Sequence, residues 1–326
     1  MTATTTYQEF SIPGYELKSL LGQGGMGEVY LAERRSSAGV PVPCVVKTII
    51  EYTNDESGVD MQEAFLNEAR ICSHLRHPNV VSIMDVGKAS DRLYITMEWV
   101  EGIDGLGLIE LGKLRKRGMS FNQALYIAHE TLKGLHYAHT AVGSESEPLN
   151  IIHRDISPDN ILISRQGAVK LADFGVAFGQ AASGEGPSSG AGKPSYMAQE
   201  LWKGGDASVQ SDIFAMGATF YELITGKQLF PPQENIFALM MMIDKFDPED
   251  MVEEMLTFPE GIEEIFIRSL AHEPADRYES VLEFLEDVND FCHESGIRLL
   301  DARFATFIER MIEFREQVKA QQEPIV

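Results

Sequence analysis

The most constraining stretch of this chain is residues 151–160, which read IIHRDISPDN. It begins with two isoleucines, and the apolar residues 161–163 follow it directly. β-Branched apolar runs on both sides predict short strands that bracket a tight polar loop. The loop gathers a carboxylate at Asp155 and an amide at Asn160. A second acidic turn, DFG at 173–175, follows within a short distance along the chain, and we expect the two turns to carry the chemistry.

A glycine-rich segment near the N-terminus is the second informative feature. Residues 21–30 read LGQGGMGEVY, so Gly22, Gly24 and Gly27 form the pattern G-x-G-x-x-G. Dinucleotide-binding folds share this pattern, but there the glycines open a helix. Here residues 28–32 are β-prone, which predicts a strand, a glycine loop and a second strand. Glycines let backbone amides approach phosphate oxygens because no Cβ intervenes, although a plain flexible hairpin has the same local sequence.

A lysine and a glutamate further along the chain are complementary candidates. Lys47 ends the apolar run 42–47, where an ammonium group needs a partner. Residues 61–75 show an apolar stripe at helical spacing, and Glu68 stands beside that stripe. We expect Glu68 to pair with Lys47. Glu63 is the competing partner, and an exposed helix charge is the alternative for Glu68.

Taken in order, these motifs resemble the protein kinase family, in particular the eukaryotic-like serine/threonine kinases of bacteria. The resemblance runs from about Tyr15 to Phe291. It implies an α+β, bilobal protein-kinase fold, with a small antiparallel-sheet N-lobe containing one helix and a larger, mainly helical C-lobe. The domain prediction is a flexible arm at 1–13, a kinase domain at 14–292 with lobes at 14–100 and 101–292, and a helical extension at 293–326.

The resemblance also implies the cofactors, ATP and Mg²⁺, and the roles of individual residues. Asp155 would orient the substrate hydroxyl, and Asn160 and Asp173 would hold Mg²⁺, a hard ion that prefers oxygen ligands. Lys47 would contact the α- and β-phosphates, with Glu68 holding it in place. The further nucleotide-binding residues implied are Leu21, Gly22, Gly24, Gly27, Val29, Val45, the gatekeeper Met97, the hinge residues Glu98 and Val100, Asp104 and Leu162. For Asp104, a ribose contact and a helix N-cap are both open.

Two departures from the family pattern lie in the catalytic segments. Ser157 stands where the family's serine/threonine kinases carry a lysine, and Lys193 stands where they carry a threonine. We hypothesise that Lys193, as a catalytic residue, supplies the missing ammonium, since lysine is long, flexible and carries a point charge. A solvated Lys193 in a slow or inactive protein is the alternative. Gln199 replaces a proline, but Glu200 still follows and is expected to pair with Arg277.

Residues 176–192 are rich in small and turn-forming residues, which predicts a mobile activation segment. Ser183, Ser188 and Ser189 are candidate autophosphorylation sites, because a phosphate there could pair with Arg154 and order the segment. An unregulated flexible loop is the alternative.

Charge and cysteine usage restrict the class of protein. The net charge is −23, and residues 244–290 carry 16 acids against 3 bases. Nucleic-acid binding is disfavoured, because phosphate neutralisation needs clustered cations. An acidic surface can attract basic protein substrates or simply keep the chain soluble. The three cysteines form no C-x-x-C pair, no signal peptide is visible, and the most apolar segment, 213–225, is too short to span a bilayer, so we expect a cytoplasmic protein without a membrane anchor.

Helical patterns fill the C-terminal half. Residues 211–226 are apolar all round, which predicts a central helix that stops at Gly226 and whose Asp212 hydrogen-bonds the catalytic-loop backbone. Residues 301–320 form an amphipathic helix. This C-terminal helix could pack on its own C-lobe, self-associate or bind a partner.

The functional prediction is an ATP-dependent serine/threonine protein kinase that acts on protein substrates. Pro158 in the catalytic loop favours serine or threonine as the acceptor, although the residue at Ser157 weakens that inference. The alternative is a pseudokinase, an ATP-binding scaffold that signals by docking. Ser157, Gln199 and the C-terminal helix favour the scaffold, and the intact acidic and lysine motifs favour the enzyme.

Overall fold

A computed structural model describes residues 11–24, 27–36, 38–49, 66, 69–89, 92–174, 193–299 and 303–322. The chain divides into two compact units. One unit comprises residues up to 75 together with 82–99, and the other comprises 76–81 and everything from 100 onward. The first unit is built on a sheet and the second is mainly helical, which confirms the predicted fold class.

The first unit contains a five-stranded antiparallel sheet with strand order β1-β2-β3-β5-β4. Its strands are β1 (Tyr15–Gly24), β2 (Gly27–Arg35), β3 (Pro41–Ile49), β4 (Ile83–Ala89) and β5 (Arg92–Glu98). Gly24 lies opposite Gly27 in the β1–β2 register, so the glycine-rich segment joins two strands of a hairpin. The predicted strand, glycine loop and strand are therefore confirmed. Most of the helix expected at 61–75 lies outside the described residues.

One face of this sheet is covered by a small apolar core. Tyr30, Cys44, Val46 and Tyr94 are buried there, and Ile12 packs with them at 2% exposure. Ile12 falls within the arm predicted at 1–13. That prediction is wrong for this residue, because Ile12 lies in a core that excludes water.

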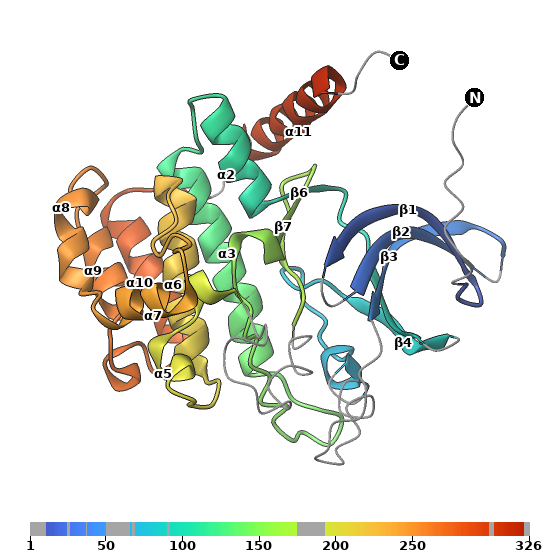
Figure 1. Ribbon diagram of the computed structural model, residues 1–326, viewed down its shortest axis with the longest axis horizontal. Helices are drawn as coiled ribbons and strands as arrows, with labels where there is room; N and C mark the ends of the chain where they lie inside the picture. The colour runs from blue at the N-terminus through green and yellow to red at the C-terminus, as the bar shows by residue number, and fades with distance from the viewer. Residues whose placement is uncertain are drawn as a thin grey trace. The chain divides into compact units, whose positions relative to one another are not determined.

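The second unit combines a three-stranded antiparallel sheet with a set of helices (Figure 1). The sheet has the order β6-β7-β8. The strands and helices of the second unit are β6 (Gly102–Asp104), α2 (Gly105–Leu114), α3 (Phe121–His139), β7 (Ile161–Ser164), β8 (Val169–Leu171), α5 (Gln199–Trp202), α6 (Val209–Thr225), α7 (Ile236–Asp244), α8 (Val252–Met255), α9 (Ile262–Ser269), α10 (Val281–Glu294) and α11 (Arg303–Gln322). Short 3₁₀ turns lie at Pro158–Asn160 and Pro194–Tyr196.

The long α6 helix is the centre of this unit. Fourteen of its residues, from Ser211 to Ile224, are buried, as its all-round apolar sequence predicts. Ser208 caps its N-terminus, and Gly226 ends it in a left-handed conformation with φ 69°. Glycine adopts this conformation without a Cβ clash, so the predicted stop is confirmed.

The C-terminal helix α11 packs on its own unit, alongside α2 and β6 (Figure 1). Its apolar stripe is buried there, with Phe304 at 5% exposure and Ile308 at 0%. The Phe304 ring meets the edge of Tyr126 at 5.0 Å, and Arg315 donates a hydrogen bond to the Gly102 carbonyl over 3.1 Å. Of the three predicted uses of this helix, packing on its own lobe is confirmed. None of the helices in the described part of the chain combines the length and hydropathy that a bilayer crossing requires.

Candidate functional site

The loop at 153–160 folds back on itself so that Asn160 reaches Asp155. A 3₁₀ turn over Pro158–Asn160 closes with a hydrogen bond from the Asn160 amide to the Ser157 carbonyl at 3.1 Å. Asn160 Nδ2 then donates to Asp155 Oδ2 at 2.8 Å and to the Asp155 carbonyl at 2.6 Å. Asp155 Oδ1 is buried and has no hydrogen-bond partner within the described part of the chain. One carboxylate oxygen is thus anchored, and the other is an acceptor without a donor among the described residues.

Asp212 of α6 fixes the start of this loop. Its Oδ2 accepts the backbone N–H of His153 at 2.7 Å, and its Oδ1 accepts that of Arg154 at 2.9 Å. His139 Nε2 also donates to Oδ2 at 2.8 Å. Burial opposes ionisation of Asp212, but these hydrogen bonds outweigh it and hold its pKa below the ordinary value. The predicted role of Asp212 is confirmed.

The anchoring explains why Ile151 and Ile152 form no strand, contrary to the prediction. The N–H groups that follow them bind a carboxylate instead of a neighbouring strand. Ile151 is buried at 6% exposure, so its apolar side chain serves the core and not a sheet. The flanking strand expected at 161–163 is confirmed as β7.

His153 connects the loop to the second acidic turn. Its Nε2 donates to the Ala172 carbonyl at 2.9 Å, and its Nδ1 accepts the Asp155 amide at 3.2 Å. Burial lowers the pKa of this imidazole, which agrees with a neutral ring that donates on one nitrogen and accepts on the other. The ring also packs against Phe174, with centroids 4.5 Å apart.

A backbone hydrogen bond joins Asn160 to the residue that precedes Asp173. The Ala172 amide donates to the Asn160 carbonyl at 2.8 Å, and Asp173 follows Ala172 directly in the chain. Arg154 and Asp173 have left-handed backbones, with φ of 69° and 61°. Such conformations cost energy in non-glycine residues and concentrate at functional sites.

The donor set suits a hard cation. An amide oxygen at Asn160 and a carboxylate at Asp173 are ligands that Mg²⁺ accepts when substrate phosphates complete its shell. Across the described ranges, no cluster of three or more His, Cys, Asp or Glu side chains could hold a metal without such phosphates. A Mg²⁺ site at Asn160 and Asp173 stays a prediction.

Lys193 reaches the same loop from the start of the turn at Pro194–Tyr196. Its Nζ donates to Ser157 Oγ at 3.1 Å and forms an ion pair with Asp159. Lys193, Arg154 and Asp155 line one small cavity. The structure thus places the ammonium of Lys193 beside Ser157, the position at which the sequence lacks the lysine of the family pattern. The Asp159 partner was not anticipated from the sequence.

In the sheet of the first unit, the strand register groups several predicted nucleotide-binding residues. Directly opposite residues in neighbouring strands share a face of the sheet. Lys47 lies opposite Val29, Val29 lies opposite Gly22, and Val45 lies opposite Met97. Since Val45 and Lys47 are two residues apart, all five share one face. Gly24 and Gly27 close the hairpin beside them, and Leu21 is 45% exposed. Glu68 lies outside the described residues.

The predicted hinge residues fall in both units. In the first, Glu98 donates its N–H to the Ser82 carbonyl at 3.0 Å and accepts the Ser82 amide on Oε1 at 2.7 Å. In the second, Asp104 Oδ1 accepts the Gly107 amide at 2.7 Å and caps α2, which confirms the N-cap alternative. Asp104 lies opposite Leu162 in the β6–β7 register. A nucleotide contact for Glu98, Val100, Asp104 or Leu162 stays a prediction.

The sequence matches the family model described as protein kinase domain over residues 15–289. The chain belongs to the protein kinase family. It is 32% identical to tyrosine-protein kinase MasK of Myxococcus xanthus over 281 residues, which cover 86% of this chain and 43% of MasK. It is 31% identical to serine/threonine-protein kinase PrkC of Bacillus subtilis over 277 residues, covering 84% and 40%. The chain therefore spans less than half the length of these two relatives.

A solved kinase domain gives the same picture. The PknI kinase domain of Mycobacterium tuberculosis is 26% identical, with a TM-score of 0.61, and the match covers 86% of this chain and 96% of that one. The predicted resemblance to bacterial kinases is confirmed.

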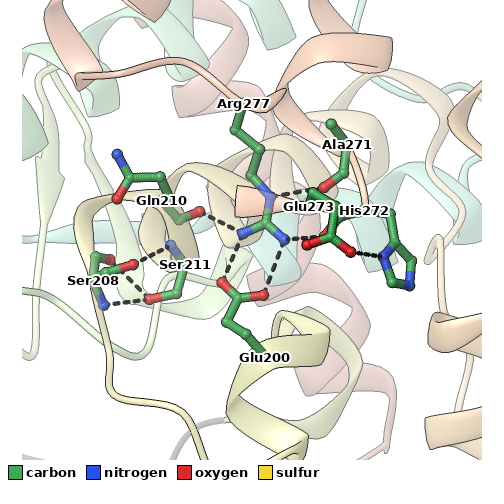
Figure 2. Close-up of polar contacts among 8 residues, drawn as sticks. All are labelled: Glu200, Ser208, Gln210, Ser211, Ala271, His272, Glu273 and Arg277. Atoms are coloured by element: carbon green, nitrogen blue, oxygen red, sulfur yellow. Dashed lines mark hydrogen bonds and ion pairs between the residues drawn. The ribbon is translucent and has the colours of Figure 1, made fainter. Parts of the chain in front are cut away.

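A largely buried ion pair between Glu200 and Arg277 joins two distant segments of the second unit. Arg277 Nη1 and Nη2 contact the two carboxylate oxygens of Glu200 at 2.8 and 3.0 Å (Figure 2). The same guanidinium donates to the carbonyls of Ala271, Gln210 and His272. The Arg277 side chain is fully buried, so every donor needs such a partner. The predicted pairing is confirmed, and Gln199 in place of proline leaves it intact.

Proposed function

We propose that this chain is an ATP-dependent protein kinase that transfers the γ-phosphoryl group to serine or threonine hydroxyls of proteins. The observation that carries the proposal is the geometry of Asp155. Its Oδ2 is held by Asn160, while its buried Oδ1 has no partner among the described residues. A buried acceptor without a donor is costly, and a substrate hydroxyl supplies that donor.

In this proposal Asp155 accepts a hydrogen bond from the substrate hydroxyl and takes its proton. The hydroxyl oxygen forms a bond to the γ-phosphorus, and the bond from that phosphorus to the β–γ bridging oxygen breaks, which releases ADP. Asn160 and Asp173 would hold Mg²⁺, which when bound neutralises charge on the phosphate oxygens. Asp212 and His153 position the loop, because their hydrogen bonds fix the backbone around Asp155.

Lys193 is proposed as a further catalytic residue. Its ammonium lies beside Ser157, two residues from Asp155, and a cation there can stabilise the negative charge of the transferring phosphoryl group. The ion pair with Asp159 holds the ammonium near that position.

Within the first unit, the sheet is proposed to contact the nucleotide. Lys47 would contact the phosphates, with Glu68 as its predicted partner. The sheet face shared by Gly22, Val29, Val45 and Met97 supports an adenine site, because apolar side chains line it.

The acceptor residue and the regulation are also proposals. Relatives include a kinase named for tyrosine and one named for serine/threonine, and Pro158 favours the latter for this chain. Autophosphorylation at Ser183, Ser188 or Ser189 falls outside the described residues. Basic protein substrates and a cytoplasmic location rest on the charge of −23 and the cysteine usage. The pseudokinase alternative finds no support, since Asp155 and Asn160 are assembled.

The test is to incubate the full chain with γ-labelled ATP and Mg²⁺, alone and with a basic protein as acceptor, and to locate the label by mass spectrometry. Label on serine or threonine supports the proposal. Label on tyrosine alone would keep the kinase and overturn the acceptor. Label that persists unchanged in Asp155→Asn would overturn the role of Asp155.

A further inference from the structure

A basic run stands out in this acidic chain. Residues 113–117 read KLRKR, so four of the 27 lysines and arginines of a chain with net charge −23 fall within five positions. They occupy the end of α2 and the turn after it, within the second unit (Figure 1). A charge run is most often a solvated face, so the run alone identifies no site.

Three residues of this run, Lys113, Lys116 and Arg117, line an open cavity. The cavity measures about 360 Å³ and lies where the end of α2 meets the end of α6. Lys113, Lys116, Arg117 and Lys227 contribute cations to its lining, and Ile109, Met119, Leu223 and Ile224 contribute apolar surface. Apolar lining with a few charged groups is the usual composition of a binding pocket.

Three of these cations have no ion-pair partner among the described residues, although the charge of Lys113 acts on the buried Glu222 carboxylate. Lys227 pairs with Glu254 at 2.7 Å, but Lys113, Lys116 and Arg117 form no ion pair across the described ranges. This is notable because acids outnumber bases by 50 to 27 in the chain. Lys116 also has a left-handed backbone, with φ 52°, a conformation that glycine would adopt at lower cost.

Helix capping does not account for the cations. Lysines at a helix C-terminus often bind the last carbonyls or offset the helix dipole. Here the backbone amides of Arg115, Lys116 and Arg117 already bind carbonyls of α2, and the Gly226 amide binds one of α6. Lys113, Lys116 and Arg117 line the cavity.

We propose that this cavity is a docking site for an acidic peptide segment of a partner protein, with an apolar side chain entering the cavity and carboxylates meeting the cations. Charge complementarity selects the occupant, since cations and apolar side chains line the same cavity. Gly226, which lines this cavity, lies fourteen residues along α6 from Asp212, or about 21 Å at the helical rise per residue.

The test is fluorescence anisotropy with a labelled peptide of alternating glutamate and leucine, and with its lysine-for-glutamate counterpart, at about 150 mM salt to screen weak attraction. The protein is the full chain without nucleotide, so the result does not depend on kinase activity. Lys113→Glu/Arg117→Glu removes the charge. Gly118→Phe narrows the cavity and keeps every charge, because an added Cβ at Gly118 meets no atom within 4 Å. Lys245→Glu/Lys319→Glu is the matched control at exposed sites with the same change in net charge.

We expect saturable binding of the acidic peptide alone, weakened at least about tenfold by the charge variant and by Gly118→Phe, and nearly unchanged in the control. Circular dichroism melts show whether each variant is folded. Equal weakening in the control, or unchanged binding with Gly118→Phe, would overturn the site in favour of general charge attraction. Self-association of the wild type that the charge variant abolishes would reassign the cavity to a second copy of the chain.

Discussion

Lys193 donates a hydrogen bond from Nζ to Ser157 Oγ over 3.1 Å, although the two residues are 36 positions apart in the chain. Ser157 follows Asp155 by two residues, so the contact brings an ammonium to the catalytic loop from a separate segment. In the proposed function this ammonium stabilises the transferring phosphoryl group. A double substitution tests this role.

Lys193→Thr is expected to lower kcat by about 10²–10³, because charge stabilisation in the transition state is lost, while ATP affinity changes little. Ser157→Lys combined with Lys193→Thr should restore most of the rate, since it returns a lysine to the same place from the other segment. Steady-state kinetics measure both. The control is Lys203→Thr, which alters an exposed lysine paired with Asp244. A rate for Lys193→Thr within about threefold of wild type would show that the lysine is only structural.

Arg277→Lys is expected to destabilise the protein by about 3–5 kcal/mol. Lysine cannot reproduce the forked contact with Glu200 and the three carbonyl contacts, so buried groups lose their partners. Urea unfolding followed by circular dichroism measures the free energy. Lys203→Met, at an exposed ion pair, should cost at most about 1 kcal/mol. Equal losses for the two variants would contradict the importance given to the buried pair.

Glu130 predicts a specific loss of stability in acid. Burial opposes its ionisation, but hydrogen bonds from His129, Lys133 and Asn79 outweigh burial and lower its pKa from 4.5 to about 2. The charged form is thus favoured in the folded state, and its contribution is full above pH 4.5 and is lost as pH falls toward 2. Glu130→Gln should therefore cost up to about 3 kcal/mol at neutral pH and progressively less in acid. Unfolding at a series of pH values, with exposed Glu110→Gln as control, measures this, and a difference independent of pH would contradict it.

The buried stripe of α11 should contribute to folding of the second unit. Ile308 is completely buried, so Ile308→Ala is expected to cost about 2–5 kcal/mol through lost burial and a residual cavity. Glu309→Ala, on the exposed face of the same helix, is the control and should lie within about 0.5 kcal/mol of wild type. Denaturant unfolding compares them. If Ile308→Ala left stability unchanged and instead altered the oligomeric state, the helix would be an interface and not part of the core.

The sequence predicted the features that local patterns encode. The glycine hairpin, the α6 helix with its Gly226 stop, and the pairing of Glu200 with Arg277 all follow from spacing, turn chemistry and family motifs. The 151–152 strand was predicted wrongly for a physical reason. Two isoleucines are compatible with either a strand or simple burial, and the nearby Asp212 carboxylate decided between them by binding the backbone that follows.

Features that depend on distant segments could not be predicted. Asp159 lies in the 3₁₀ turn at Pro158–Asn160 and forms an ion pair with Lys193. The spacing of these residues in the sequence does not reveal this contact. The basic cavity needs the ends of α2 and α6, more than a hundred residues apart in sequence, to meet. The KLRKR run was visible in the sequence, but only the fold shows that three of its residues line a cavity together with apolar side chains.

The most direct test of the central claim compares wild type with Asp155→Asn in phosphoryl transfer from γ-labelled ATP, with nucleotide affinity measured in parallel. Asparagine is nearly isosteric and can still contact Asn160, but it cannot take the proton of the substrate hydroxyl. We predict that transfer falls by about 10²–10⁴ while the affinity for ATP is kept. Transfer that continues at the wild-type rate in Asp155→Asn would contradict the account of this site.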